Sequence, residues 1–105
     1  MNQECKIKWV EALRSGEYQQ GQGGLRIADK YCCLGVLLDV CSGKGNWIQM
    51  SGGGWSYVVN DDSRTGYPPN DYMGLSRENA EKAAEKNDAH GWTFAQIADW
   101  VEEAL

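Results

Sequence analysis

Residues 31–40 read Tyr-Cys-Cys-Leu-Gly-Val-Leu-Leu-Asp-Val and form the longest apolar run of the sequence. The run predicts a strand at residues 31–33 that leads into a helix. The helix is predicted because one helical face has the spacing of Leu34, Leu37, Leu38 and Cys41. Gly35 costs up to about 1 kcal/mol relative to alanine inside a helix, so we expect another backbone or an aromatic ring to approach it closely. A buried strand that continues to residue 40 is the competing interpretation.

The residues before this run predict a helix and the first strand of a hairpin. Gly16 supplies a C-terminal stop to a helix over residues 3–15, whose inner face is formed by Cys5, Trp9, Ala12 and Leu13. Residues 17–24 are polar and rich in glycine, which predicts a turn or loop. Residues 25–27 alternate as Leu-Arg-Ile and predict a strand that pairs with residues 31–33 across a tight turn.

Two aromatic segments after the run predict a second hairpin. Residues 47–50 and 55–59 alternate weakly, and the Ser-Gly-Gly-Gly between them is typical of a turn. Residues 60–70 predict a loop, because they combine two aspartates, a glycine and two prolines. Residues 71–75 are expected to form a single turn that docks on the core.

The C-terminal third of the sequence predicts two helices. Ser76 is an expected N-cap for a helix that runs to residue 85 or 86. Thr93 and Gln96 have the spacing of a capping box at the start of the last helix. The inner stripe of that helix is Phe94, Ile97, Ala98, Val101 and Leu105.

Together these elements predict an α+β fold in one domain, residues 1–105. It combines an N-terminal helix, a short antiparallel sheet of two hairpins, a central helix and two C-terminal helices. A chain of 105 residues can bury a core without metals or disulfides. Five tryptophans, five tyrosines and one phenylalanine supply large buried areas.

The charge of the chain bears on its partners. Fifteen acidic and ten basic residues give a formal net charge of -5, which disfavours binding to a long nucleic acid. The same acidity suits a basic protein surface, although charge that keeps the protein in solution is the plainer interpretation. The acidic side chains considered for protein contacts are Asp61, Asp62, Asp99, Glu102 and Glu103.

Several patterns of the sequence bear on its location and its cysteines. Residues 1–4 lack the features of a signal peptide, and no run approaches the ~18 apolar residues of a membrane span, so we expect a cytoplasmic protein without membrane contact. In that reducing compartment we expect free thiols that act as small buried hydrophobic groups. Cys32 and Cys33 are adjacent and lack the spacing of a zinc or redox pair, so no metal is expected.

The sequence does not indicate an enzyme. His90 lies near Asp88 in a polar turn, but no nucleophile is placed by a recognisable motif, so a hydrolase is a remote alternative. The glycine-rich segments lack the pattern of a phosphate loop, and no cofactor is expected. A ligand site is a stronger candidate: Trp47, Trp55 and Tyr57 lie near Lys44 and Arg64, and aromatic faces beside a cation suit a base and a phosphate. The competing interpretation is that these aromatic residues only cover a small sheet.

Three segments of the sequence carry a resemblance to a family. They begin Trp9-Val-Glu-Ala-Leu-Arg-Ser-Gly-Glu-Tyr, Tyr31-Cys-Cys-Leu-Gly-Val and Asn87-Asp, the last continuing to Gly91-Trp-Thr-Phe-Ala-Gln-Ile-Ala-Asp-Trp. In this order they resemble a family of small proteins encoded by bacteriophages and prophages, whereas residues 43–70 match no pattern of it. The resemblance implies a phage origin and no established enzymatic activity.

Two functions follow from that resemblance as expectations. The first is a non-catalytic accessory protein that counters host immunity by binding a host immune component, as an anti-CRISPR or a similar inhibitor does, in the cytoplasm of an infected bacterium. The alternative is a binder that sequesters a nucleotide-like immune signal. The oligomeric state stays open, although surplus tryptophan would suit a homo-oligomer that buries some of it between subunits.

Overall fold

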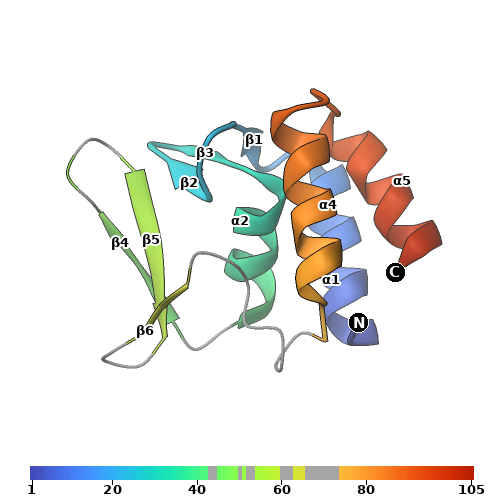
Figure 1. Ribbon diagram of the computed structural model, residues 1–105, viewed down its shortest axis with the longest axis horizontal. Helices are drawn as coiled ribbons and strands as arrows, with labels where there is room; N and C mark the ends of the chain where they lie inside the picture. The colour runs from blue at the N-terminus through green and yellow to red at the C-terminus, as the bar shows by residue number, and fades with distance from the viewer. Residues whose placement is uncertain (43–44, 50, 52–53, 60–62, 66–73) are drawn as a thin grey trace.

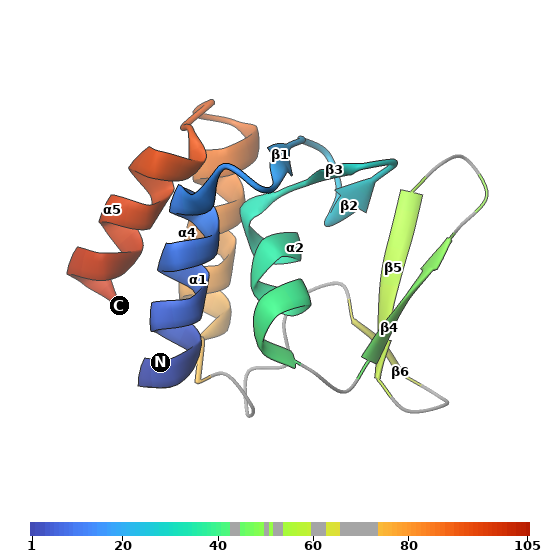
Figure 2. The same ribbon diagram turned by 180° about the vertical axis from the view of Figure 1, so that it is seen from behind.

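The computed structural model describes residues 1–42, 45–49, 51, 54–59, 63–65 and 74–105 and confirms the α+β fold. Helices gather at one end of the molecule and the longer strands lie at the other (Figures 1 and 2). The helices are α1 (Gln3–Ser15), α2 (Cys33–Leu37), the π-helical turn η1 (Leu38–Ser42), α4 (Arg77–Asp88) and α5 (Phe94–Ala104). The strands are β1 (Gln19–Gln20), β2 (Arg26–Ile27), β3 (Lys30–Tyr31), β4 (Gly45–Gln49), β5 (Gly54–Val59) and β6 (Ser63–Thr65).

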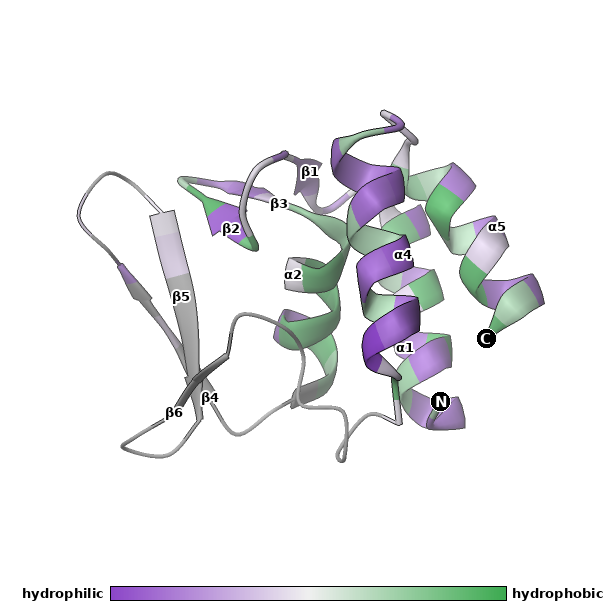
Figure 3. Ribbon diagram, viewed as in Figure 1, coloured by the Kyte–Doolittle hydropathy of each residue, from purple (hydrophilic) through white to green (hydrophobic). Residues whose placement is uncertain are grey.

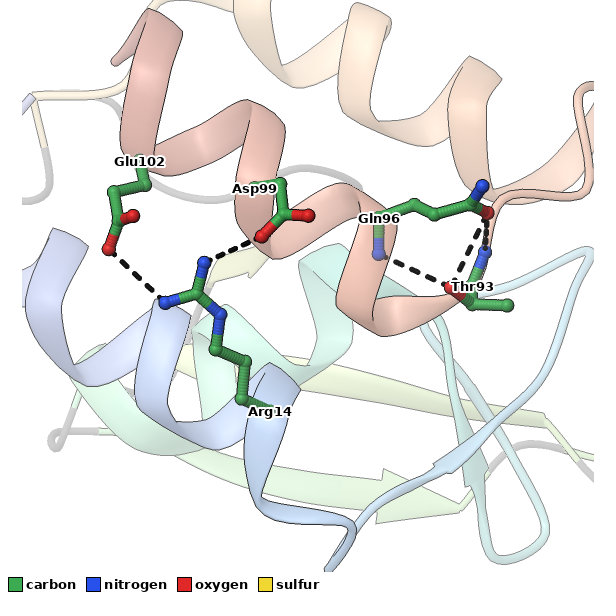
Figure 4. Close-up of polar contacts among 5 residues, drawn as sticks. All are labelled: Arg14, Thr93, Gln96, Asp99 and Glu102. Atoms are coloured by element: carbon green, nitrogen blue, oxygen red, sulfur yellow. Dashed lines mark hydrogen bonds and ion pairs between the residues drawn. The ribbon is translucent and has the colours of Figure 1, made fainter.

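The helix ends follow the capping chemistry that the sequence predicts. Gly16 ends α1 in the left-handed conformation, with φ 78°. The Ser76 hydroxyl accepts a hydrogen bond from the backbone N–H of Asn79 at the start of α4. Thr93 and Gln96 form the reciprocal capping box of α5 (Figure 4). These predicted boundaries are confirmed.

The apolar run that begins at residue 31 occupies the centre of the core. All five residues of α2 are buried, and the helix is apolar along its length (Figure 3). Trp9 of α1 is fully buried against it, and its Nε1 donates a hydrogen bond to the Cys33 carbonyl at 2.9 Å. Ala80 and Ala83 are the buried residues of α4 toward this core, and their small size allows the helices to approach closely. The predicted change from strand to helix is confirmed, but β3 ends at Tyr31, α2 begins at Cys33 and the rest of the run, from Leu38, belongs to the π-helical turn η1.

The close approach of another backbone to Gly35, which the glycine in a helix predicts, is confirmed. A Cβ atom at this position would lie 1.9 Å from the Leu25 carbonyl oxygen. The same carbonyl accepts a hydrogen bond from the Cys32 backbone N–H at 3.1 Å. Only a residue without a side chain lets the segment before β2 cross the start of α2 at this distance.

The sheet contains both predicted hairpins and joins them. β2 pairs antiparallel with β3, and β4 pairs antiparallel with β5. β2 also pairs antiparallel with β5, which gives the strand order β1-β3-β2-β5-β4, with β6 on β5. Two parts differ from the prediction: β1 lies where a loop is expected and pairs parallel with β3, and β6 lies within the expected loop of residues 60–70.

One buried polar residue explains why the polar segment before β2 is ordered. Asn87, at the end of α4, is fully buried. Its Oδ1 accepts hydrogen bonds from Gln20 Nε2 at 2.9 Å and from the Cys33 backbone N–H at 3.3 Å. Its Nδ2 donates to the Gly21 carbonyl at 2.9 Å and to Asp88 Oδ1 at 2.8 Å. The amide thus fixes β1 and the start of α2 to α4 through hydrogen bonds that the pattern of apolar residues in the sequence does not predict.

The expectation of free cysteines is wrong for one pair. Cys5 of α1 and Cys41 of η1 form a disulfide, with their Cα atoms 5.5 Å apart. The packing of α1 against η1 brings together two residues 36 positions apart, which the sequence alone does not show. Cys32 and Cys33 are free and buried, as expected of small apolar groups, and burial raises the pKa of both thiols.

Among the described residues, no helix is long and apolar enough to cross a membrane. The remaining residues of the expected loop, 60–62 and 66–70, lie outside the described part of the chain, as do residues 71–73 of the expected turn. Leu75, at the end of that turn, is buried in the core.

Candidate binding surface

The pairing of four strands places an arginine among three aromatic rings. Arg26 of β2 lies directly opposite Tyr31 of β3 and directly opposite Trp55 of β5. Trp55 pairs with Gln49 of β4, and Trp47 lies two residues before Gln49 on the same strand. Residues two apart on a strand share a face, so Trp47 lies on the same face of the sheet as Trp55. The Arg26 Cζ atom lies 4.1 Å from the ring centroid of Trp55, 5.1 Å from that of Tyr31 and 5.6 Å from that of Trp47. These distances are those of cation–π contacts.

The turn between β2 and β3 helps to hold this arginine. Arg26 Nε donates a hydrogen bond to the Ala28 carbonyl at 3.1 Å. Ala28 has a φ of 54°, in the left-handed region that costs a residue with a side chain about 1–2 kcal/mol. The strained residue, Ala28, is thus the one whose carbonyl holds the Arg26 guanidinium.

A carboxylate joins the sheet to the helical end of the same surface. Asp39 of η1 accepts a hydrogen bond from Trp47 Nε1 on one oxygen, at 3.0 Å, and from the Tyr18 hydroxyl on the other, at 2.5 Å. Tyr18 and Tyr31 meet edge to face with centroids 5.0 Å apart, and Tyr31 and Trp47 do so at 5.8 Å. Burial, followed by the bond to Asp39, raises the pKa of the Tyr18 hydroxyl well above its usual value.

We call these six residues the aromatic–arginine face: Tyr18, Arg26, Tyr31, Asp39, Trp47 and Trp55. None of the six is fully buried, and Tyr18, Tyr31 and Trp47 also pack against the hydrophobic core. Burial raises the pKa of Tyr31, while Arg26 opposes that shift. The Trp55 Nε1 atom is buried and has no hydrogen-bond partner among the described residues.

The structure brings together part of the ligand site predicted from the sequence. Trp47 and Trp55 lie on the aromatic–arginine face, whereas Lys44 is outside the described residues. Tyr57 and Arg64 belong to β5 and β6, and only their backbone is described: Tyr57 pairs with Trp47 across the hairpin. The cation beside the rings is Arg26, which sequence reasoning missed together with Tyr18, Tyr31 and Asp39. The register of the first hairpin was the available signal, because it sets Arg26 against Tyr31.

The acidic residues considered for protein contacts separate into three groups. Asp61 and Asp62 lie outside the described residues. Asp99 and Glu102 of α5 bind Arg14 of α1, with oxygen to nitrogen distances of 2.7 and 3.2 Å (Figure 4). These bonds raise the pKa of Arg14 and connect the two helices. Glu103 is exposed and lies outside this cluster.

In the polar turn, the single histidine lies beside Glu85 and not beside Asp88, the partner considered from the sequence. His90 Nε2 lies 3.3 Å from Glu85 Oε1. Asp88 instead accepts hydrogen bonds from Asn87 Nδ2 and from the Gly23 backbone N–H. Among the described residues, no group of three or more His, Cys, Asp or Glu could hold a metal ion.

Comparison with known proteins identifies a family but no activity. The family model described as Domain of unknown function (DUF8296) matches residues 1–68. No curated protein and no solved structure matches the chain. The matched part runs from α1 to β6 and contains the whole aromatic–arginine face, whereas α4 and α5 follow it.

Proposed function

The chain belongs to the DUF8296 family, and we propose that it is a non-catalytic binding protein whose contact surface is the aromatic–arginine face. The observation that carries the proposal is the Arg26 guanidinium held among three partly exposed aromatic rings. Tryptophan, tyrosine and arginine are the residues that dominate the binding energy of protein interfaces. Their concentration on one face of a small sheet favours a binding role.

The contacts within the face also lower the cost of binding. Arg26 is held by the Ala28 carbonyl and by the rings, and the Asp39 carboxylate orients Tyr18 and Trp47. Side chains that are already ordered lose less conformational entropy when a partner arrives, typically by about 0.5–1.5 kcal/mol for each long side chain. The face is therefore organised before the partner binds.

A protein partner agrees better with this geometry than a nucleotide-like signal. Arg26 already contacts the rings on which a base would stack. The Asp39 carboxylate lies on the same face, and the net charge of -5 opposes a phosphate further. A nucleotide sponge is the weaker alternative, supported by Trp47 and Trp55 alone.

The resemblance to phage-encoded proteins supplies the biological setting of the proposal. We place the protein inside an infected bacterium, where it would counter host immunity by binding an immune protein, as an anti-CRISPR does. The acidity of the chain supports a basic protein surface as the target. We propose no catalytic step.

The test compares variants of the face in infected cells. Bacteria that each carry one defence system would express the wild type, Arg26→Ala, Arg26→Lys or Arg77→Ala, and phage plating efficiency would be measured. Arg77 is the matched control, because it is an exposed arginine on α4 that pairs only with Glu81 among the described residues. We expect the wild type and Arg77→Ala to restore phage growth on at least one defended host.

Both Arg26 variants should lose that effect, since lysine keeps the charge but not the planar stacking of arginine. Circular dichroism and thermal unfolding would show that each variant folds. Material released by denaturing the purified protein would separate the two ligand classes: a compound that absorbs near 260 nm would favour the nucleotide sponge. Equal activity of folded Arg26→Ala and wild type would exclude the face as the contact surface.

A further inference from the structure

A second surface lies on α5, at the end of the molecule away from β4 and β5 (Figures 1 and 2). It is a groove of about 290 Å³ lined by Trp92, Gln96, Asp99, Trp100 and Glu103. Gln96, Trp100 and Glu103 follow the spacing i, i+4 and i+7, so they form one stripe of the helix. The buried stripe of α5 is a different one, with Phe94, Ile97, Ala98 and Val101. The groove is thus an outward face with two large aromatic rings.

The two rings of this groove already hold a cation of the same chain. The Lys86 ammonium lies 4.6 Å from the ring centroid of Trp92 and 5.0 Å from that of Trp100. Lys86 belongs to α4 and does not line the groove. The position of Trp92 is fixed by its backbone, whose N–H donates to the Lys86 carbonyl at 3.0 Å. The rings are therefore placed by the fold in a geometry that attracts positive charge.

Carboxylates complete the wall of the groove. Asp99 is exposed and uses Oδ1 to bind Arg14, which leaves its second oxygen outside that bond. Glu103 is also exposed and makes no ion pair among the described residues. Aromatic rings beside carboxylates are the combination that a guanidinium group satisfies best, because it stacks on a ring and forms paired hydrogen bonds with a carboxylate.

We propose that the α5 groove binds an arginine side chain in a basic segment of a partner protein. Charge complementarity selects this occupant: the lining has two carboxylates, of which Glu103 makes no ion pair among the described residues, and the chain has a net charge of -5. The Lys86 ammonium over the two rings is the cation that the incoming guanidinium would replace. The proposal goes beyond the aromatic–arginine face, because the two surfaces share no residue and α5 lies at the end of the molecule away from β4 and β5 (Figures 1 and 2). It holds or fails independently of the function proposed above.

The test follows the indole N–H signals of the tryptophans by NMR while a peptide is added at low salt. The probe is acetyl-Gly-Arg-Arg-Gly-amide, and acetyl-Gly-Gln-Gln-Gly-amide is its uncharged control. Trp92→Phe and Trp100→Phe would assign the two signals of the groove. We expect saturable shifts of these signals with the arginine peptide and no saturable shift with the glutamine peptide.

Matched variants separate a site from general attraction to an acidic protein. Glu103→Gln and Glu81→Gln change the net charge equally, but only Glu103 lines the groove. Glu103→Gln should weaken peptide binding about threefold, the scale of one exposed ion pair, while Glu81→Gln should leave it nearly unchanged. Equal weakening by both variants, equal binding of the glutamine peptide, or the absence of shifts at Trp92 and Trp100 would each overturn the proposal.

Discussion

Replacement of Asn87 by alanine should remove a large part of the stability of this fold. The amide is fully buried and makes hydrogen bonds with both of its polar atoms. Without it, the Cys33 backbone N–H and the Gly21 carbonyl lose the side chain that pairs with them, while Gln20 keeps its bond to the Trp92 carbonyl. Each orphaned group costs about 1–3 kcal/mol, so two of them give a loss of about 2–6 kcal/mol.

Urea unfolding followed by circular dichroism measures this loss directly. A domain of this size has a free energy of unfolding of about 5–15 kcal/mol, so the variant should unfold at a clearly lower urea concentration with little change in slope. Asn79→Ala is the control, since Asn79 lies on the same helix and its side chain makes no hydrogen bond among the described residues. A loss below about 1 kcal/mol for Asn87→Ala, or one equal to that of the control, would refute the assignment of Asn87 as the polar centre of the fold.

Three further predictions concern single features of the structure. Gly35→Ala should prevent folding or lower the free energy of unfolding by about 3 kcal/mol or more, because its Cβ would lie 1.9 Å from a backbone oxygen; loss of less than about 1 kcal/mol in urea unfolding would contradict this close contact. Thiol titration of the denatured, unreduced protein should find two free thiols, whereas four would show that the pair is reduced. Cys41→Ser should lower the free energy of unfolding by about 4 kcal/mol, because it removes a link to Cys5 across 36 residues. Because burial and the bond to Asp39 raise the pKa of Tyr18 in the folded state, its contribution to stability is complete below about pH 10 and is lost as the pH rises above that value. Tyr18→Phe should therefore flatten the alkaline part of a plot of stability against pH, and an unchanged plot would show that folding does not raise the pKa of Tyr18.

The local part of this structure follows from the sequence. The capping box of Thr93 and Gln96 and the stop at Gly16 mark helix ends through bonds between neighbouring residues, so short patterns report them. The cost of Gly35 in a helix also predicts a close backbone neighbour, although not that the neighbour is Leu25. Such features depend on few residues and little tertiary context.

The parts that the sequence does not predict depend on partners far along the chain. β1 consists of two glutamines, and its position rests on a strand 11 residues later and on Asn87, whose bond to Gln20 spans 67 residues. The disulfide spans 36 residues. On the candidate surface, sequence proximity selects Lys44 as the cation near Trp47, whereas strand register selects Arg26. The first hairpin can set Arg26 beside Tyr31, but the register between β2 and β5, which brings Arg26 to Trp55, joins strands of different hairpins and has no local signal.

The most direct test of the proposed function is to capture a host protein from a lysate with the purified protein and to measure the affinity of the pair. Once the wild type has recovered a defined host protein, calorimetry would measure its Kd for the wild type, Arg26→Ala and Arg77→Ala. A central interface arginine predicts a loss of about tenfold or more for Arg26→Ala and an unchanged Kd for Arg77→Ala. An unchanged Kd for a folded Arg26→Ala variant would contradict the claim that the aromatic–arginine face binds the partner.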